Sequence, residues 1–306
     1  MARAVRFDEY GGVDVLEVRD VEPPEPGPGQ VLVEVRAAGI NPGEAKIRSG
    51  ALHEMWPSTF PSGEGSDFAG VVTTLGEGAH GVAVGDEVIG WTDTRGSHAE
   101  LVVAPAEHLT PKPAAVSWEV AGALFVVGTT AYAAVHAIGA SAGDTIVVSA
   151  AAGGVGSVTV QLARRAGATV IGLASERNHA WLSGHGIIPV AYGDGVAQRI
   201  GEAAPRGVDA LIDLAGGGYV TLGLELGVAP DRIDTIVDYA AVQEHGVKAE
   251  GSAAAARAEV LAELAGMIAA GELEIPIART YPLDQVRDAF TDLAQGHTRG
   301  KIVLVP

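Results

Sequence analysis

Apolar and polar positions divide the chain into a first part dominated by strands and a later part in which strands and helices alternate. From residue 30 to residue 36, Val31, Val33 and Val35 lie on one face of an alternating pattern, which predicts a half-buried strand. Further short apolar runs at 70–75 and 98–103 are separated by glycine-rich turns. Many short strands of this kind, up to about residue 110, predict a small barrel-like β domain.

Between residues 121 and 271 the pattern changes. Short β-branched runs at 145–149, 169–173 and 208–214 alternate with segments whose apolar residues have helical spacing, and Ser252 is expected to cap one of these helices. This alternation predicts an α/β domain with a doubly wound parallel sheet. The tail, 272–306, returns to strand, helix and strand, so we expect residues 1–120 and 272–306 to form one domain around an inserted domain of residues 121–271.

The motif on which the functional prediction depends lies between two strands of this inserted domain. An apolar run ends at Ser149, a glycine-rich turn follows, and a helical pattern and a second apolar run complete a βαβ unit. Such a turn lets the backbone approach a pyrophosphate at a helix N-terminus. Ala151 replaces the usual first glycine, which a negative φ allows. The alternative is a tight connection with small residues for packing; we favour a dinucleotide site made by Ala152, Gly153, Gly154, Val155 and Gly156.

Composition narrows the possible partners. The chain has 306 residues and a formal net charge of −18, which disfavours binding to nucleic acid or to an anionic membrane. It has neither an apolar run of membrane-spanning length nor a recognisable signal peptide, so we expect a cytoplasmic protein. The absence of cysteine excludes disulfides, a thiol nucleophile and zinc held by cysteine.

Five segments, in this order, carry a resemblance to a known family: 39–42 (GINP), 65–72 (GSDFAGVV), 85–90 (GDEVIG), 128–132 with 150–156 (GTTAY and AAAGGVG), and 299–304 (RGKIVL). The chain resembles the medium-chain dehydrogenase/reductase superfamily, in particular its zinc-independent quinone oxidoreductase (zeta-crystallin-like) group. The resemblance implies a GroES-like β-barrel domain, a Rossmann domain, and a cleft between them where hydride leaves NAD(P)H. It also implies a homodimer through the edge of the Rossmann sheet.

The residues themselves argue against a catalytic zinc ion. Zinc alcohol dehydrogenases of this superfamily hold the metal with cysteine and with a histidine of a Gly-His-Glu motif, which here is Gly65-Ser66-Asp67. Serine is a poor zinc ligand, and none of the nine histidines forms a closely spaced pair on one helix face. Without a Lewis acid, the enzyme is better suited to deliver hydride to an activated acceptor than to ionise an alcohol.

The end of the second strand of the βαβ unit predicts the cofactor. An acidic residue about 20 positions after the glycines would bind the ribose 2′-hydroxyl of NAD, but Ser175 stands there. Ser175 can donate to a phosphate and Arg177 can pair with its charge, which favours NADP(H). Glu176 leaves NAD(H) open, and Arg177 has an alternative role as a surface cation. The resemblance adds Tyr192, Arg299 and Lys301 as residues near the cofactor.

The resemblance also places Asn41 and Thr130 near the nicotinamide. The Asn41 amide could hydrogen-bond an acceptor carbonyl or the ribose, or it could form the turn before Pro42. Thr130 could bond the nicotinamide amide, or it could cap a helix. Lys46 and Leu52 stand where some relatives have tyrosines, so no side-chain proton donor is evident. We expect the proton to come from water; a catalytic part for Lys46 is the alternative, and otherwise it is a solvated lysine.

The acceptor remains open at this stage. An aromatic lining suits a flat conjugated molecule, and the residues expected to form it are Leu52, Trp56 and Trp91, with His53 and Met55 beside them. Core or interdomain packing is the alternative for both tryptophans. We therefore expect an NADPH-dependent quinone oxidoreductase. The alternatives are an enoyl or enone reductase and, in another class, an NADP-binding redox-sensing or structural protein with little turnover.

Overall fold

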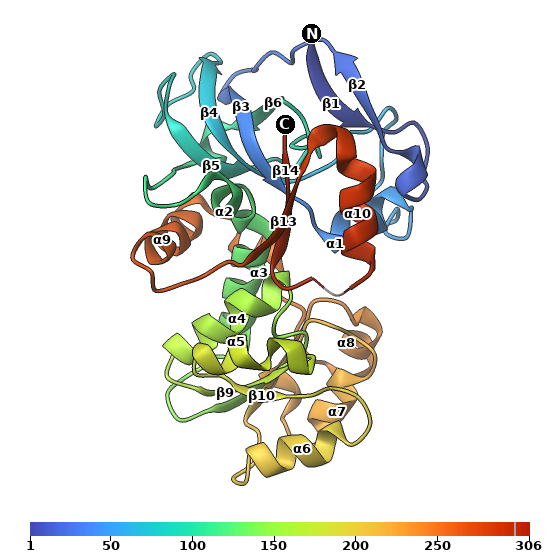
Figure 1. The fold of residues 1–306 in the computed structure, drawn as a ribbon, viewed down its shortest axis with the longest axis vertical. Coiled ribbons are helices and arrows are strands. Elements are labelled where there is room, and N and C mark those ends of the chain that lie inside the picture. Colours follow the sequence, from blue (N-terminus) through green and yellow to red (C-terminus); the bar gives the residue numbers. More distant parts are fainter. Residues whose placement is uncertain (297) are drawn as a thin grey trace. The chain divides into compact units, whose positions relative to one another are not determined.

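The computed structural model describes residues 1–296 and 298–306 (Figure 1). They form two compact units: residues 1–126 with 257–306, and residues 127–256. The sequence pattern suggested boundaries at 120 and 271. The second boundary lies earlier because helix α9 (Ala258–Ala269) packs against β5 (Glu87–Trp91) and β7 (Thr110–Pro111) of the first unit.

The first unit is built on a mixed seven-stranded sheet. Its strand order is β13-β14-β3-β4-β5-β7, with β6 paired to β3. Figure 1 shows the C-terminal strands β13 and β14, in red, beside β3, in blue. A separate antiparallel pair, β1 with β2, completes the strands of this unit. The remaining strand bounds are Ala2–Arg6 for β1, Glu17–Val21 for β2, Gln30–Gly39 for β3, Asp67–Leu75 for β4, Leu101–Pro105 for β6, Ile277–Pro282 for β13 and Lys301–Val305 for β14.

The apolar faces predicted for these strands meet in two cores. Val31, Val33 and Val35 pack in one cluster with residues of β4, β5 and β6, as the alternation in β3 predicted. A second cluster joins β1 and β14 to helix α10 (Val286–Ala294). The other helices of the unit are α1 (Pro42–Arg48) and α2 (Trp118–Gly122), with 3-10 turns at Val13–Val15, Ala106–His108 and Leu283–Gln285.

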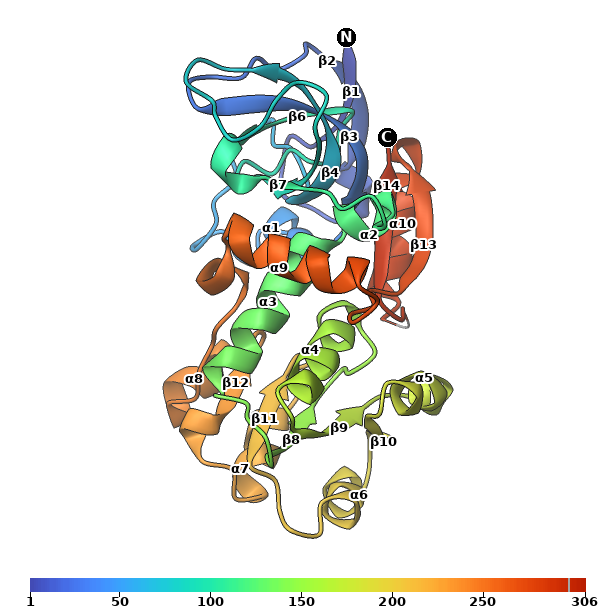
Figure 2. The same ribbon diagram turned by 90° about the vertical axis from the view of Figure 1, so that its left-hand side faces the viewer.

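The second unit is a five-stranded, fully parallel sheet in the order β10-β9-β8-β11-β12, flanked by helices (Figure 2). The order starts at β8 and runs outward in both directions, which is the doubly wound Rossmann arrangement. The strands are β8 (Thr145–Val148), β9 (Thr169–Leu173), β10 (Ile188–Val190), β11 (Ala210–Asp213) and β12 (Ile233–Thr235). The α/β fold predicted from the sequence is confirmed.

Helices α3 to α8 connect and flank these strands. Their bounds are Leu124–Ala137 for α3, Gly154–Arg165 for α4, His179–Gly184 for α5, Val196–Ala203 for α6, Tyr219–Glu225 for α7 and Tyr239–His245 for α8, with 3-10 turns at Glu176–Asn178, Pro230–Arg232 and Ser252–Ala255. In the part of the chain that the structure describes, no helix is both long and apolar enough to cross a membrane.

Two local predictions were wrong. Ser252 does not cap the alanine-rich helix: it begins a 3-10 turn, and α9 starts only after Arg257, its N-cap. Asn41-Pro42, for which a turn was one of the alternatives, instead begins helix α1. Its start has an asparagine at the N-cap, proline at the first helical position and Glu44 at the third, a pattern that favours a helix N-terminus.

The outer edge of β12 is partly covered by the chain itself. The backbone N–H of Lys248 donates to the Ile233 carbonyl at 2.9 Å, and the Lys248 carbonyl accepts from the N–H of Thr235 at 3.0 Å. A dimer that adds a strand at these residues must therefore displace Lys248. The homodimer through this edge stays a prediction.

Candidate active site

The glycine turn joins β8 to α4 through a strained backbone. Ala150, directly before the turn, has φ of +47°, a left-handed conformation that costs an alanine roughly 1–2 kcal/mol. Ala151, at the usual place of the first glycine, keeps a negative φ, as the sequence required. A Cβ added at Gly156 would overlap the Ala150 carbonyl oxygen. Only glycine therefore lets α4 start this close to the strand, with Gly153 as its N-cap.

Three predicted cofactor residues follow the neighbouring strands at the same edge of the sheet. Ser175 and Arg177 come after β9, and Tyr192 comes after β10. Backbone bonds tie these segments together: the Ala151 N–H donates to Leu173 at 3.0 Å, and the Ala174 N–H donates to Val190 at 3.1 Å. Arg177 and Tyr192 are exposed and Ser175 is half-buried. The carboxyl edge of a Rossmann sheet is where dinucleotides bind, so these residues fit such a cofactor.

In the first unit, the Asn41 amide is held inside a buried network. Its oxygen accepts from the Lys301 ammonium at 2.5 Å, and its nitrogen donates to Glu44 at 3.1 Å and to Asp67 at 3.3 Å. The Glu44 carboxylate also accepts the Asn41 backbone N–H at 2.8 Å, which caps α1. Asn41 has 4% of its surface exposed. Both amide N–H groups already have partners, so a bond donated to an acceptor carbonyl would have to replace one of them; the catalytic role of Asn41 stays a prediction.

Lys301 is the first residue of β14, and its side chain lies inside the first unit. It is 3% exposed, and its ammonium donates to the Ile40 carbonyl at 2.8 Å and to Asn41, with Asp67 at 3.7 Å. The resemblance had assigned Lys301 to the cofactor, whereas these contacts all lie within the first unit. Arg299, two residues earlier, has an exposed side chain.

The network contains more buried acids than its one ammonium can neutralise. Burial raises the pKa of Asp67 to about 6, while the Lys301 charge opposes this rise. Burial also raises the pKa of Glu44 and lowers the pKa of Lys301. Asp67 is further fixed by the N–H of Val126, which donates to it at 3.0 Å. Ionisation of one carboxyl therefore depends on the others and on the ammonium between them.

A neutral histidine and a buried ion pair lie beside this network. His98 is fully buried, its Nε2 lies 3.2 Å from the Gly39 carbonyl, and burial lowers its pKa to about 4, so it is neutral at physiological pH. Arg48 and Glu64 form a buried ion pair, and the Arg48 guanidinium lies 4.5 Å from the centre of the Phe290 ring. Sequence reasoning did not find these partners. In the sequence, only one feature could have indicated these contacts: polar or charged residues stand next to segments predicted to be buried.

The predicted acceptor residues separate into exposed and buried groups. Trp56 is 47% exposed in the segment after α1, and Leu52 is half-buried there. Trp91 is 3% exposed and is stacked between His108 and Phe125, with ring centroids at 4.1 and 4.6 Å. Trp91 thus has the packing role that was the alternative for it. An acceptor contact stays a prediction for all three lining residues.

Thr130 is 5% exposed and lies within α3, which begins at Leu124. It therefore does not cap this helix, which was the alternative to a nicotinamide contact. The nicotinamide contact itself stays a prediction.

Comparison with known proteins identifies the family. The alcohol dehydrogenase GroES-like domain matches residues 27–114, and the zinc-binding dehydrogenase domain matches residues 190–304. The quinone oxidoreductase of Pseudomonas aeruginosa is 32% identical, over 100% of this chain and 100% of its own length. This chain belongs to the quinone oxidoreductase group of the medium-chain dehydrogenase/reductases.

Two other relatives agree with this assignment. The quinone oxidoreductase of Mus musculus is 30% identical, over 100% of this chain and 98% of its own. The solved quinone oxidoreductase from Coxiella burnetii is 32% identical and has a TM-score of 0.89, covering 100% of this chain and 99% of that one. The resemblance found in the sequence is confirmed, and so is the GroES-like plus Rossmann architecture. The chain is therefore an oxidoreductase.

The zinc-binding name of the matched domain describes a family that includes metal enzymes. In this chain, Ser66 stands where the resemblance places the histidine ligand of the zinc enzymes, and its N–H donates to Glu44 at 3.2 Å. Across residues 1–296 and 298–306, no group of three or more His, Cys, Asp or Glu side chains could hold a metal ion. The donor set thus does not fit a catalytic zinc, and we derive no step through one.

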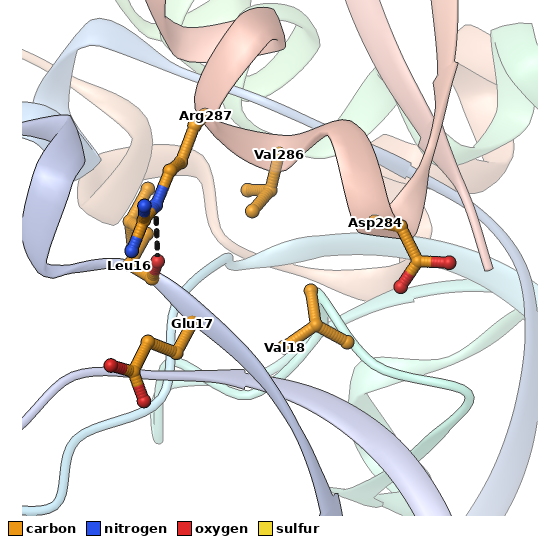
Figure 3. Close-up of a pocket in the computed structure, with 6 residues that line it drawn as sticks. All are labelled: Leu16, Glu17, Val18, Asp284, Val286 and Arg287. Carbon is orange, nitrogen blue, oxygen red and sulfur yellow. Dashed lines mark hydrogen bonds between the residues drawn. The ribbon is translucent and has the colours of Figure 1, made fainter.

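A surface pocket of about 360 Å³ lies elsewhere in the first unit. Figure 3 shows its lining residues, which come from the start of β2 and from α10 and the turn before it: Leu16, Glu17, Val18, Asp284, Val286 and Arg287. Arg287 donates to the Leu16 carbonyl at 2.7 Å across it. None of the predicted site residues lines this pocket, so it forms no part of the candidate active site.

Proposed function

We propose that this oxidoreductase transfers a hydride from NADPH to a quinone without a metal ion. One observation carries the proposal: the glycine turn before α4 and the Ser175–Arg177 segment follow adjacent parallel strands, β8 and β9, at one edge of the sheet. A pyrophosphate and a ribose 2′-phosphate require such a pair of sites. The names of the relatives from P. aeruginosa and M. musculus support a quinone as acceptor.

The chain's own residues bind and orient the cofactor. The N-terminus of α4, a helix of 12 residues, offers free N–H groups and the positive end of the helix dipole to the pyrophosphate. Arg177 pairs with the 2′-phosphate, and Ser175 donates a hydrogen bond to it. Tyr192, which is 52% exposed, packs against the cofactor from the end of β10. Thr130 bonds the nicotinamide amide and Arg299 lies near the cofactor.

The acceptor side supplies orientation and excludes water. When bound, NADPH supplies the hydride, and one proton from water completes the reduction of a quinone to a hydroquinone. Leu52 and Trp56 contact the flat face of the acceptor. Asn41, whose amide is fixed by Lys301, Glu44 and Asp67, forms part of the wall of the acceptor site. Water rather than the exposed Lys46 supplies this proton in the proposal. The proposal includes a cytoplasmic homodimer.

An acceptor panel tests this function. We expect the purified protein to oxidise NADPH with 1,4-quinones at a higher kcat/KM than with α,β-unsaturated ketones or enoyl thioesters. The reverse order would make it an enone reductase. Tight NADPH binding without turnover on any acceptor would favour a redox-sensing or structural protein.

A further inference from the structure

A buried polar cluster lies on the opposite side of β8 from the predicted phosphate residues. Asp213, the last residue of β11, is fully buried, and its carboxylate accepts four hydrogen bonds. One oxygen accepts from the Ser149 hydroxyl at 2.8 Å and from the N–H groups of Ala215 at 3.0 Å and Gly216 at 2.9 Å. The other accepts from the Thr235 hydroxyl at 3.0 Å. This carboxylate therefore joins the carboxyl ends of β8, β11 and β12.

Ser149 links the cluster to the glycine turn. Its hydroxyl donates to Asp213 and accepts from the Leu214 N–H at 2.8 Å, and its backbone N–H donates to Ile212 at 3.0 Å. The next residue is Ala150, whose φ is +47° and whose carbonyl accepts from the Gly153 N–H at 2.9 Å. Ser149 is thus fixed by both side chain and main chain directly before the strained residue.

We propose that Asp213 is a positioning residue for the dinucleotide site, which acts through Ser149 on the turn from Ala150 to Gly156. The inference rests on the proposed function. A backbone that cradles a pyrophosphate must hold its N–H groups in place before the ligand arrives, and an alanine stays in the left-handed region only when its neighbours enforce it. Without this link the turn relaxes, so that affinity falls while the chemistry of the bound complex is unchanged.

Ser149 and Thr235 provide a matched pair for the test. Both side chains are fully buried and both donate to the same carboxylate, but only Ser149 leads to the glycine turn. We expect Ser149→Ala to weaken NADPH binding about tenfold and Thr235→Val to change it less than about twofold. The readout is a fluorescence titration with NADPH in the absence of acceptor. Thermal unfolding without cofactor measures the stability lost by each variant.

Variants of Asp213 itself separate positioning from folding. Asn keeps one oxygen acceptor in place, so Asp213→Asn should bind NADPH within about threefold of the wild type, whereas Asp213→Ala should lose about thirtyfold. In steady state, the KM for NADPH rises and kcat stays within about twofold, because the acceptor side is untouched. If Asp213→Ala does not fold, the comparison of Ser149→Ala with Thr235→Val decides.

The outcomes are distinct. Equal NADPH affinity in Ser149→Ala and Thr235→Val, whatever their stability, would overturn the positioning role and leave the proposed function standing. A wild-type protein that binds neither NADPH nor NADH would overturn the proposed function and, with it, this inference.

Discussion

The ammonium of Lys301 lies 2.5 Å from the amide oxygen of Asn41, although 260 residues separate them along the chain. This contact fixes the orientation of the amide, because its nitrogen must then face the carboxylates of Glu44 and Asp67. Asn41, which is expected to contact the acceptor, is therefore held in place by Lys301 at the start of β14. Lys301 thus holds Asn41 within the first unit, and its contact with the cofactor stays a prediction.

Replacing Lys301 by methionine should destabilise the protein in a pH-dependent way. Two buried carboxyls would lose their cation, which costs about 3–5 kcal/mol when both are ionised. The pKa of Asp67, already raised to about 6, would rise further without the nearby positive charge. A group with a raised folded pKa contributes stability that is present at low pH and lost as the pH rises through that pKa. The deficit should therefore be smaller at pH 5 than at pH 8, as measured by urea unfolding.

Lys46→Met is the matched control for this prediction, because Lys46 is exposed on α1. We expect it to change the unfolding free energy by less than about 0.5 kcal/mol and to leave turnover unchanged. A Lys301→Met protein as stable as the wild type at pH 8 would contradict the role given to the buried ammonium.

Arg177 should determine the preference for the phosphorylated cofactor. Removing a charge-assisted contact to the 2′-phosphate should lower kcat/KM for NADPH about ten- to a hundredfold in Arg177→Ala. The value for NADH should stay nearly constant, since NADH has no 2′-phosphate. Arg206→Ala, an exposed arginine in the segment before β11, should change neither value. An equal decrease of kcat/KM with both cofactors would show that Arg177 does not recognise the 2′-phosphate.

Gly156 should be intolerant of any side chain. A Cβ there overlaps the carbonyl oxygen of Ala150, so Gly156→Ala must push α4 away from β8 at a cost of about 1–3 kcal/mol. NADPH affinity should fall as the turn opens. Gly201→Ala, in α6 of the same unit, meets no atom within 4 Å and should keep the affinity and raise stability by up to about 1 kcal/mol. Titration and thermal unfolding of both variants check this, and unchanged binding by Gly156→Ala would refute it.

Trp56 and Trp91, the two tryptophans predicted to contact the acceptor, should differ in how their truncation affects stability and the quinone KM. Trp91 is stacked in the core, so Trp91→Ala should cost about 3–5 kcal/mol of stability. Trp56 is half exposed, so Trp56→Ala should cost less than about 1 kcal/mol but should raise the KM for the quinone. Chemical unfolding and steady-state kinetics separate the two effects. An unchanged quinone KM in Trp56→Ala would remove this residue from the acceptor site.

The sequence predicted the Rossmann unit well because its signals are local. Apolar runs, a glycine turn and a helical pattern lie within about 35 residues, a distance over which spacing determines structure. Helix α1 was missed because Asn41-Pro42 was taken as a turn signal, although Glu44 completes a helix cap. The domain boundary near α9 was misplaced because the apolar spacing of an amphipathic helix shows which face is buried but not which sheet it packs against.

The buried network could not be predicted by the same means. Asn41, Asp67 and Lys301 come from three separate strand ends, and only the pairing of β14 with β3 and of β3 with β4 brings them together. A lysine in an apolar strand such as 301–305 indicates that a partner exists, but not which carboxylate it is. For the same reason nothing in the run 208–214 distinguished Asp213, and its four donors became apparent only with the parallel sheet.

The central claim is tested most directly by NADPH oxidation with a 1,4-quinone, measured on protein dialysed against a metal chelator and compared with the same assay using NADH. We predict that NADPH is consumed in equal amount to the hydroquinone formed, with a kcat/KM at least about tenfold above that for NADH and no loss of rate after chelation. Failure to reduce any quinone, a preference for NADH, or activity that returns only when zinc is added would contradict the account.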